Sequence, residues 1–290
     1  MSPFRTDLTM EAAEAQHRQG LYSLPGVEER TYDREGCGVT SVRVTSAEGA
    51  KLLDKPIGSY VTLDLSDLAR REPDAFARSV RAVAAELSGM LPANSQGCVL
   101  VVGLGNRMVT PDAVGPRVAD QILVTRHLLR QEPERFAPFR PVCAIATGVL
   151  GTTGIESVEL VEAAVSRVRP ELVIAVDALA ARSAQRLCTT VQIGDTGIVP
   201  GSGIGNAREA LDRQHLGVPV IAMGIPTVVE AATLAMDLTG QEGGGDLSDL
   251  LVTPKDIDVQ LSDLSKVVGY GINLALQEGL EIEDIDLLLS

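Results

Sequence analysis

The middle of this chain alternates short apolar runs with segments of helical spacing, and this alternation restricts the possible folds more than any other feature. Strand-forming runs separated by helices are typical of a mostly parallel sheet with helices on both faces. Runs that are apolar almost throughout suit strands that are buried on both sides. Five such runs are expected to be strands: residues 98–104, 141–147, 172–177, 187–193 and 219–224.

The flanking segments extend this pattern. Two more strands are expected at residues 38–46 and 59–65, and helices at residues 73–87, 113–130, 157–167 and 228–236. Pro226 would then lie in the first turn of the last helix, a position that tolerates proline. We therefore expect a three-layer α/β fold of about seven strands, with a mostly parallel or mixed sheet flanked by helices.

Three segments fall outside the pattern. The N-terminal residues up to Gly20 are expected to form an exposed arm, since chain termini are often poorly ordered. The glycine-rich residues 240–249 predict a surface loop. The acidic tail from Glu278 predicts a short helix or an oligomer contact.

The charge of the chain argues against a nucleic-acid partner. Its 290 residues include 25 Lys and Arg against 39 Asp and Glu, a net charge of −14, with no evident basic stretch. There are four Tyr, four Phe and no Trp, too few aromatics for a platform that stacks bases. No signal peptide and no membrane-spanning run is apparent, so we expect no membrane partner and a cytoplasmic location.

The first candidate site residue is Asp112. It follows the first apolar run of the central region, within the segment GLGNRMVTPDAVGPRVAD. The Gly-x-Gly of this segment lacks the third glycine of a dinucleotide-binding fingerprint, because that position is Met108. Taken alone, the Asp112 carboxylate is interpreted as the N-cap of the helix that follows.

The second candidate is Asp177, which ends another apolar run. Ligands of open α/β sheets bind beyond the carboxyl ends of the strands, so Asp112 and Asp177 would meet if both strand ends face one crevice. Two close carboxylates cannot both ionise cheaply, so one keeps a proton while the other acts as a base on water. Peptide-bond hydrolysis needs this division of roles. A metal ion held by the two aspartates stays open as an alternative, although no third ligand is apparent.

Three glycine-rich loops at residues 147–157, 194–206 and 224–231 are expected at the same edge of the sheet. Their backbone N–H groups are suited to binding a peptide main chain or an oxyanion. The candidate substrate contacts within them are Gly151, Thr152, Gly201 and Gly203. His17, His127 and His215 are scattered, and no HExxH, GxSxG or P-loop motif is present.

The segments GLGNRMVTPDAVGPRV, TGVLGTTGIES, VDALAAR, QIGDTGIVPGSGIGN, GIPTVVEA and VTPKDID together resemble the germination protease family of endospore-forming bacteria. The resemblance is collinear from about Phe4 to Leu276. It implies an endopeptidase without a cofactor, located in the forespore or spore core. Such an enzyme degrades small acid-soluble spore proteins, is made as an inactive precursor and forms a homotetramer. The implied fold is that of hydrogenase-maturation endopeptidases, and the implied catalytic pair falls on Asp112 and Asp177.

The same resemblance gives the N-terminus a role. The resemblance implies cleavage after an acidic residue and before an aliphatic one, also at a processing site in the precursor, and the segment RTDLTME at residues 5–11 has this form. We therefore predict self-cleavage between Asp7 and Leu8, with residues 1–7 as a propeptide and residues 8–290 as a single protease domain. Thr9 departs from the family's usual alanine. Candidates for binding the substrate's acidic side chain are Arg107, Arg117, Arg182 and Arg186.

Two other functions stay open. A metal-dependent maturation endopeptidase would use the same aspartates as metal ligands. A small-molecule-binding module would use the glycine loops without any chemistry.

Overall fold

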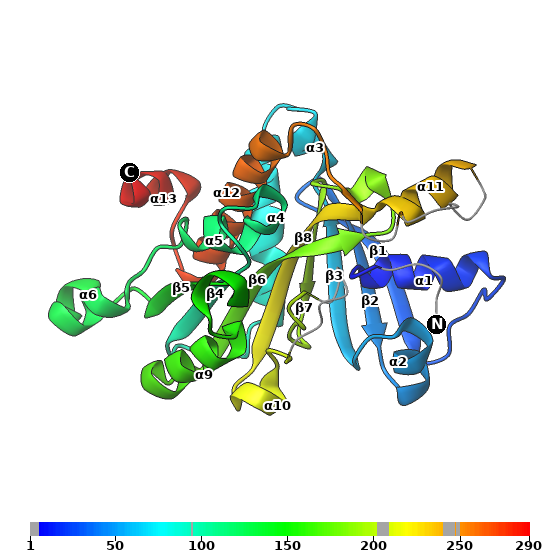
Figure 1. Cartoon of the computed structure of the whole chain (residues 1–290). Coiled ribbons are helices and arrows are strands. Elements are labelled where there is room, and N and C mark those ends of the chain that lie inside the picture. The colour runs from blue at the N-terminus through cyan, green and yellow to red at the C-terminus, as the bar shows by residue number, and fades with distance from the viewer. Residues whose placement is uncertain (1–5, 94, 202–208, 240–246, 248–249) are drawn as a thin grey trace.

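The computed structural model describes residues 6–93, 95–201, 209–239, 247 and 250–290. Within them the strands form one nine-stranded sheet in the order β1-β2-β3-β7-β8-β6-β4-β5, with β9 beside β8 (Figure 1). The strands are β1 (Val27–Arg34), β2 (Cys37–Val44), β3 (Gly58–Asp64), β4 (Val99–Leu104), β5 (Val142–Gly148), β6 (Leu172–Ala181), β7 (Thr190–Gly194), β8 (Val220–Glu230) and β9 (Leu251–Val252). The strands β5, β4, β6 and β8 run parallel, and the other pairs are antiparallel. The expected α/β class is confirmed, and the sheet is mixed.

Helices cover both faces of this sheet. They are α1 (Thr9–Arg18), α2 (Ala47–Leu53), α3 (Ser66–Ala69), α4 (Ala75–Met90), α5 (Val114–Ala119), α6 (Arg126–Gln131), α7 (Pro133–Phe136), α8 (Leu150–Thr153), α9 (Ser157–Val168), α10 (Arg213–Leu216), α11 (Ala231–Thr239), α12 (Ile257–Leu276) and α13 (Ile282–Leu289). Two 3-10 turns, η1 (Thr110–Asp112) and η2 (Ala184–Arg186), complete the elements.

The two faces have separate hydrophobic cores. On one face α4, α5 and α12 pack over alternate residues of β6, including Ile174 and Val176. On the other face α9 packs over Val173 and Ala175. Further along this second face, α1 and α2 cover β2 and β3. The second layer is therefore made of two parts, with α9 at one end of the sheet and α1 and α2 at the other (Figure 1).

One expected helix is broken. Residues 113–130 form two short helices, α5 and α6, separated by residues 120–125. In that gap the N–H of Leu123 donates to the Asn273 side chain of α12, and the N–H of Thr125 donates to the carbonyl of Val142. These tertiary hydrogen bonds replace the helical ones, so a pattern with helical spacing does not give a continuous helix.

A second correction concerns Pro226. It lies inside β8, which continues to Glu230, and α11 begins only at Ala231. The missing N–H of proline is tolerated at an irregularity in the β6–β8 pairing, where the register shifts between Leu179 and Ala180. The Pro226 carbonyl still accepts a hydrogen bond from the N–H of Cys188.

The N-terminal arm is a third correction. Instead of an exposed segment, it contains helix α1, and Leu8, Thr9 and Ala13 are fully buried. Periodicity missed this because α1 is short and polar, and its burial depends on contacts with β6 and β7 that lie far away in the sequence. The acidic tail forms helix α13, which agrees with the expectation of a short helix. The glycine-rich stretch lies almost wholly outside the described residues.

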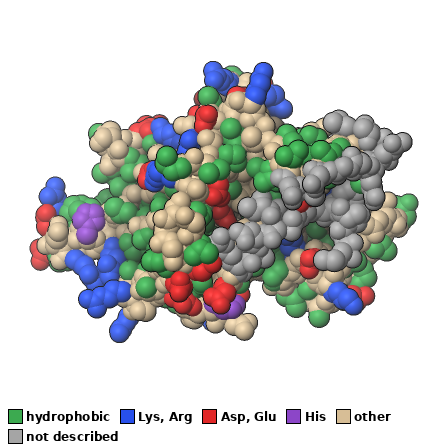
Figure 2. Space-filling model, viewed as in Figure 1, with side chains coloured by type: hydrophobic (Ala, Val, Ile, Leu, Met, Phe, Trp, Pro, Cys, Tyr) green, Lys and Arg blue, Asp and Glu red, His purple; other side chains and the backbone are tan. Residues whose placement is uncertain are grey.

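In the part of the chain that the structure describes, no helix is both long and apolar enough to cross a membrane. Figure 2 shows one face of the molecule, on which the described Lys and Arg side chains form small separate groups. They make no continuous basic stripe on the atoms drawn there in colour.

Candidate active site

Asp177 lies on β6 at the carboxyl end of its neighbour β4. Gly103 of β4 is level with Val176, so Asp177 is one residue beyond that pair. Its side chain shares a face with Ala175 and Leu179, because alternate residues of a strand point the same way. The residue is 6% exposed, and one carboxylate oxygen accepts a 2.9 Å hydrogen bond from the N–H of Ala178.

Asp112 reaches the same strand ends from the 3-10 turn η1, which follows β4. Its carboxylate accepts a 2.7 Å hydrogen bond from the N–H of Asn106. Helix α5 begins after Ala113 without a side-chain cap, so the interpretation of Asp112 as an N-cap is wrong. The turn approaches β4 closely: at Gly105, with a φ of +106°, an added Cβ would lie 2.1 Å from the Asp112 carbonyl oxygen.

The two carboxylates interact electrostatically. Burial raises the pKa of Asp177 to about 8, and the negative charges of Asp112 and Asp7 add to the rise. The hydrogen bond from Ala178 opposes it. Asp177 therefore holds its proton at neutral pH, the state that a general acid requires.

The N-terminal segment lies against the open edge of β6. Since β6 continues to Ala181 while β4 stops at Leu104, no strand among the described residues pairs with this part of the β6 edge on the β4 side. Asp7 occupies this edge: its N–H donates to the Ala180 carbonyl at 2.9 Å, and its carboxylate accepts from the Ala180 N–H at 2.8 Å. Pairing with a free strand edge is a common way to bind an extended peptide.

The residue after Asp7 fills an apolar pocket. Leu8 is fully buried and packs with four side chains of β6, β8 and the segment after β6, namely Leu179, Ala181, Leu187 and Val229. The N–H of Leu8 donates to the Thr6 hydroxyl at 3.1 Å. The segment is thus held both by main-chain hydrogen bonds and by an aliphatic side chain.

Two polar side chains contact the carbonyl oxygen of Asp7. The Lys55 ammonium lies 3.1 Å from it and 3.3 Å from the carbonyl oxygen of Thr6. The amide nitrogen of Gln192 lies 3.2 Å from the Asp7 oxygen. The amide oxygen of Gln192 accepts from the N–H of Thr9 at 2.7 Å.

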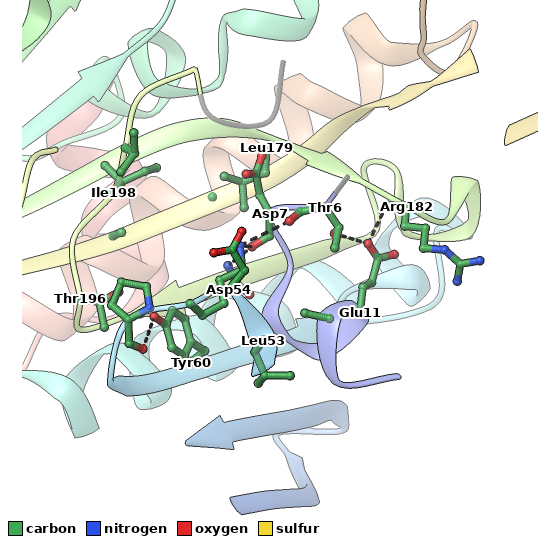
Figure 3. A pocket seen from close by; sticks show the side chains of 18 of the residues that line it. Thr6, Asp7, Glu11, Leu53, Asp54, Tyr60, Leu179, Arg182, Thr196 and Ile198 are labelled. Atoms are coloured by element: carbon green, nitrogen blue, oxygen red, sulfur yellow. Dashed lines mark hydrogen bonds between the residues drawn. The ribbon is translucent and has the colours of Figure 1, made fainter. Parts of the chain in front are cut away.

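Further along, Glu11 is bound by a set of donors. Its side chain is 1% exposed and accepts from the N–H groups of Arg182 at 2.6 Å and Ser183 at 3.0 Å. The Arg186 guanidinium donates to it at 2.9 Å and also pairs with Glu14. Figure 3 shows Glu11 and Asp7 on the same segment, with Arg182 beside Glu11.

A cavity of about 1100 Å³ lies beside this segment. Its walls come from α1, the loop after α2, and strands β3, β6, β7 and β8 (Figure 3). Asp7, Lys55 and Gln192 line it, and so does Gly224, which pairs with Asp177 in the sheet. Asp112 and Asp177 themselves do not line the cavity.

The structure separates the other candidate residues. Arg107 is half-exposed and pairs with Asp120, and Arg117 pairs with Asp258 of α12 at 3.8 Å. Neither arginine lines the cavity. The described glycine-loop candidates, Gly151, Thr152 and Gly201, do not line the cavity, and Gly203 lies outside the described residues.

Sequence reasoning missed Lys55, Gln192 and Glu11. Gln192 carried a weak signal, because it interrupts an expected apolar strand. Lys55 and Glu11 carried none, because their contacts exist only in the folded chain. Among the described residues, no group of three or more His, Cys, Asp and Glu side chains is placed to hold a metal ion.

The chain has a mixed α/β sheet, a protonated carboxyl beside a second carboxylate, and a peptide segment on the adjacent strand edge. These are the features of a hydrolase that acts on peptides. Comparison with known proteins identifies the family. The family model described as "Germination protease" matches residues 5–240. The chain belongs to the germination protease family, and it is a peptidase.

Relatives match over nearly the whole chain. The germination protease of Clostridium tetani (strain Massachusetts / E88) is 38% identical, and the match covers 99% of each chain. That of Bacillus subtilis (strain 168) is 43% identical, covering 97% of this chain and 95% of the relative.

A solved structure, the [NiFe] hydrogenase maturation protease HycI from Thermococcus kodakarensis KOD1, is 16% identical with a TM-score of 0.37, covering 64% of this chain and 98% of that one. This likeness is too distant to carry a conclusion.

Proposed function

We propose that the chain is an aspartic-type endopeptidase of the spore that first cuts itself between Asp7 and Leu8 and then degrades small acid-soluble spore proteins. The observation that carries the proposal is the pair of hydrogen bonds between Asp7 and Ala180. They hold a peptide segment against β6, close enough for the charge of Asp7 to raise the pKa of Asp177. Residues 1–7 are then the propeptide, and residues 8–290 form the protease domain.

The two aspartates divide the chemistry. Asp112, as the ionised member, takes a proton from a water molecule that attacks the carbonyl carbon of Asp7. Asp177, which holds its proton because burial raises its pKa to about 8, gives that proton to the leaving nitrogen of Leu8. No metal ion is required by this scheme.

The contacts of the N-terminal segment support the proposed specificity. The Leu8 pocket is lined by aliphatic side chains, which suits an aliphatic residue after the cut. Arg186, with the backbone N–H groups of Arg182 and Ser183, binds the carboxylate of Glu11. We therefore assign Arg186 and Arg182 to an acidic residue beyond the cut rather than to the acidic residue before it.

The proposed setting is the spore core, with the enzyme as a homotetramer. Its family relatives carry the name germination protease, which supports this setting. With a net charge of −14, the enzyme would have little affinity for DNA. It would meet DNA-coating proteins mainly after they dissociate.

The test is digestion of a purified small acid-soluble spore protein by the chain after its processing. We expect fragments whose new N-termini are aliphatic residues that follow an acidic residue. A spore protein that stays intact, or cuts at unrelated positions, would contradict the proposal.

The metal-dependent alternative is tested by chelation. An aspartic-type enzyme should cut the spore protein at an unchanged rate after dialysis against a chelator, with metal content measured in parallel. Loss of cutting that returns when Zn²⁺ is added would favour the alternative, in which the aspartates are ligands.

A further inference from the structure

The carbonyl oxygen of Asp7 has two side-chain donors that the aspartate scheme leaves without a role. We propose that Lys55 and Gln192 form the oxyanion site of this protease, and that they bind the carbonyl oxygen of the bond being cut. This inference rests on the proposed function, in which the bond between Asp7 and Leu8 is the first one cleaved.

The sheet itself places Gln192 opposite Asp177. Gln192 of β7 pairs with Gly224 of β8, and Gly224 pairs with Asp177 of β6. The three residues form one row across adjacent strands, so their side chains project from the same face. With strands about 4.8 Å apart, the two outer Cα atoms are roughly 10 Å from each other.

The residue in the middle of this row has no side chain. Gly224 lines the cavity, and the Leu179 side chain lies directly over it, because an added Cβ would be 2.4 Å from Leu179. Leu179 is part of the pocket that holds Leu8. A side chain at position 224 would therefore displace a wall of this pocket.

The amide of Gln192 makes two hydrogen bonds with main-chain atoms of the described part of the segment. Its nitrogen donates to the Asp7 carbonyl at 3.2 Å, and its oxygen accepts from the Thr9 N–H at 2.7 Å. One amide thus bridges both sides of the Asp7–Leu8 bond. Such a contact fixes the position of the bond for any sequence, because it uses no side chain of the substrate.

Lys55 supplies the positive charge of the proposed oxyanion site. It is half-buried between α2 and β3, and its ammonium lies 3.1 Å from the Asp7 oxygen. Burial lowers its pKa, while the charges of Asp7, Asp54 and Glu11 raise it. A cation shielded from water stabilises a neighbouring oxyanion more strongly than an exposed one.

The bond between Asp7 and Leu8 breaks by addition of water and then loss of the amine. Water adds to the carbonyl carbon of Asp7, one of its protons passes to Asp112, and the carbonyl oxygen becomes an oxyanion held by Lys55 and Gln192. The oxyanion then collapses as the bond to Leu8 breaks, and the nitrogen takes the proton of Asp177. The products are a new carboxyl group on Asp7 and a free amine on Leu8.

The experiment follows self-processing of the purified full-length chain by intact mass. Loss of one oxyanion donor costs about 100- to 1000-fold in rate in a comparable protease. We expect Lys55→Met and Gln192→Glu each to slow the appearance of the chain beginning at Leu8 by about 100-fold or more. Glutamate at position 192 keeps an acceptor for Thr9 but has no donor for the Asp7 carbonyl. Lys266→Met, on α12 and outside the cavity, is the matched control and should process at the wild-type rate.

A structural role would give different results. If Lys55 only restrains the segment, Lys55→Met should process as fast as wild type or faster, and that result would overturn the inference. In cleavage of an added peptide, loss of oxyanion binding lowers kcat and leaves KM nearly unchanged. A change confined to KM would also overturn it.

The inference and the proposed function fail separately. If Asp112→Asn blocks processing while Lys55→Met and Gln192→Glu process normally, only the oxyanion site is wrong. If Asp112→Asn processes normally, the aspartate mechanism itself is wrong.

Discussion

At the level of a single residue, burial determines the protonation state of Asp177. A carboxyl group that is 6% exposed and close to the charges of Asp112 and Asp7 has a pKa of about 8. The same residue on an exposed strand end would be ionised at neutral pH. Burial in the sheet thus keeps this aspartate protonated at neutral pH, so that it can act as an acid.

The raised pKa predicts how stability depends on pH. Because the folded chain holds this proton more tightly than the unfolded one, the contribution of Asp177 is fully present below the reference pKa of 3.8 and is lost as the pH rises through about 8. Asp177→Asn should remove this loss of stability at high pH. At alkaline pH the variant should be more stable than wild type by on the order of a few kcal/mol.

Urea denaturation at several pH values measures this difference. Glu48→Gln, on the exposed side of α2, is the control and should follow the wild-type curve. A wild type and an Asp177→Asn variant with parallel pH profiles would show that Asp177 has an ordinary pKa.

The rate of self-processing should follow the same group. Since Asp177 must hold a proton to act as the acid, the rate should fall as the pH rises through about 8. Stopped samples analysed by mass give this profile. A rate that keeps rising with pH would assign the proton donation to a different group.

At the scale of elements, the site depends on how closely α5 approaches the sheet. A Cβ at Gly115 of α5 would lie 2.2 Å from the Leu104 carbonyl oxygen and 2.4 Å from that of Val176. This contact holds the turn that carries Asp112 against the ends of β4 and β6. Only glycine allows this close approach. The sequence alone does not show why glycine is needed, because the reason depends on β4 and β6 being neighbours in the sheet.

Gly115→Ala should therefore lower the free energy of unfolding by about 1–3 kcal/mol, because helix and sheet must move apart. Gly89→Ala in α4 is the matched control. Nothing lies within 4 Å of its added Cβ, so that change should be neutral or slightly stabilising. Denaturant titration compares them, and equal stability of the two variants would contradict the close approach.

Helix α1 is held in place by Glu11. Glu11→Gln replaces a buried carboxylate, bound by Arg186 and two backbone N–H groups, with a neutral amide. Charge-assisted hydrogen bonds contribute about 1.5–3 kcal/mol each, so amide exchange in α1 should speed up about tenfold or more. Hydrogen exchange measured by mass spectrometry tests this, with Glu48→Gln as the exposed control. Unchanged protection of α1 would show that other contacts hold the segment.

At the scale of the whole molecule, the sequence predicted the strands that are apolar on both faces. The runs at residues 98–104 and 141–147 correspond to β4 and β5 within a residue or two. The parallel pairing of β4 and β6 brings Asp112, in the turn after β4, close enough for its charge to raise the pKa of Asp177. Strand β1, which is mostly polar and exposed, had no such signal and was missed.

The role of the N-terminus could not be read from local pattern. Its residues are mostly polar, and only the pairing of Asp7 with Ala180 and the burial of Leu8 against β6 show that it is part of the core. For the same reason Lys55 and Gln192 were missed, since they meet only around that segment. Long-range contacts, rather than propensity, place these residues.

The central claim is that Asp112 and Asp177 cut the bond between Asp7 and Leu8. The most direct measurement is the intact mass of the full-length chain held at mildly acid pH, beside Asp112→Asn and Asp177→Asn. We expect the wild type to convert to a chain beginning at Leu8, and both variants to keep their full mass. Conversion of either variant at the wild-type rate, or a wild type that never loses residues 1–7, would contradict it.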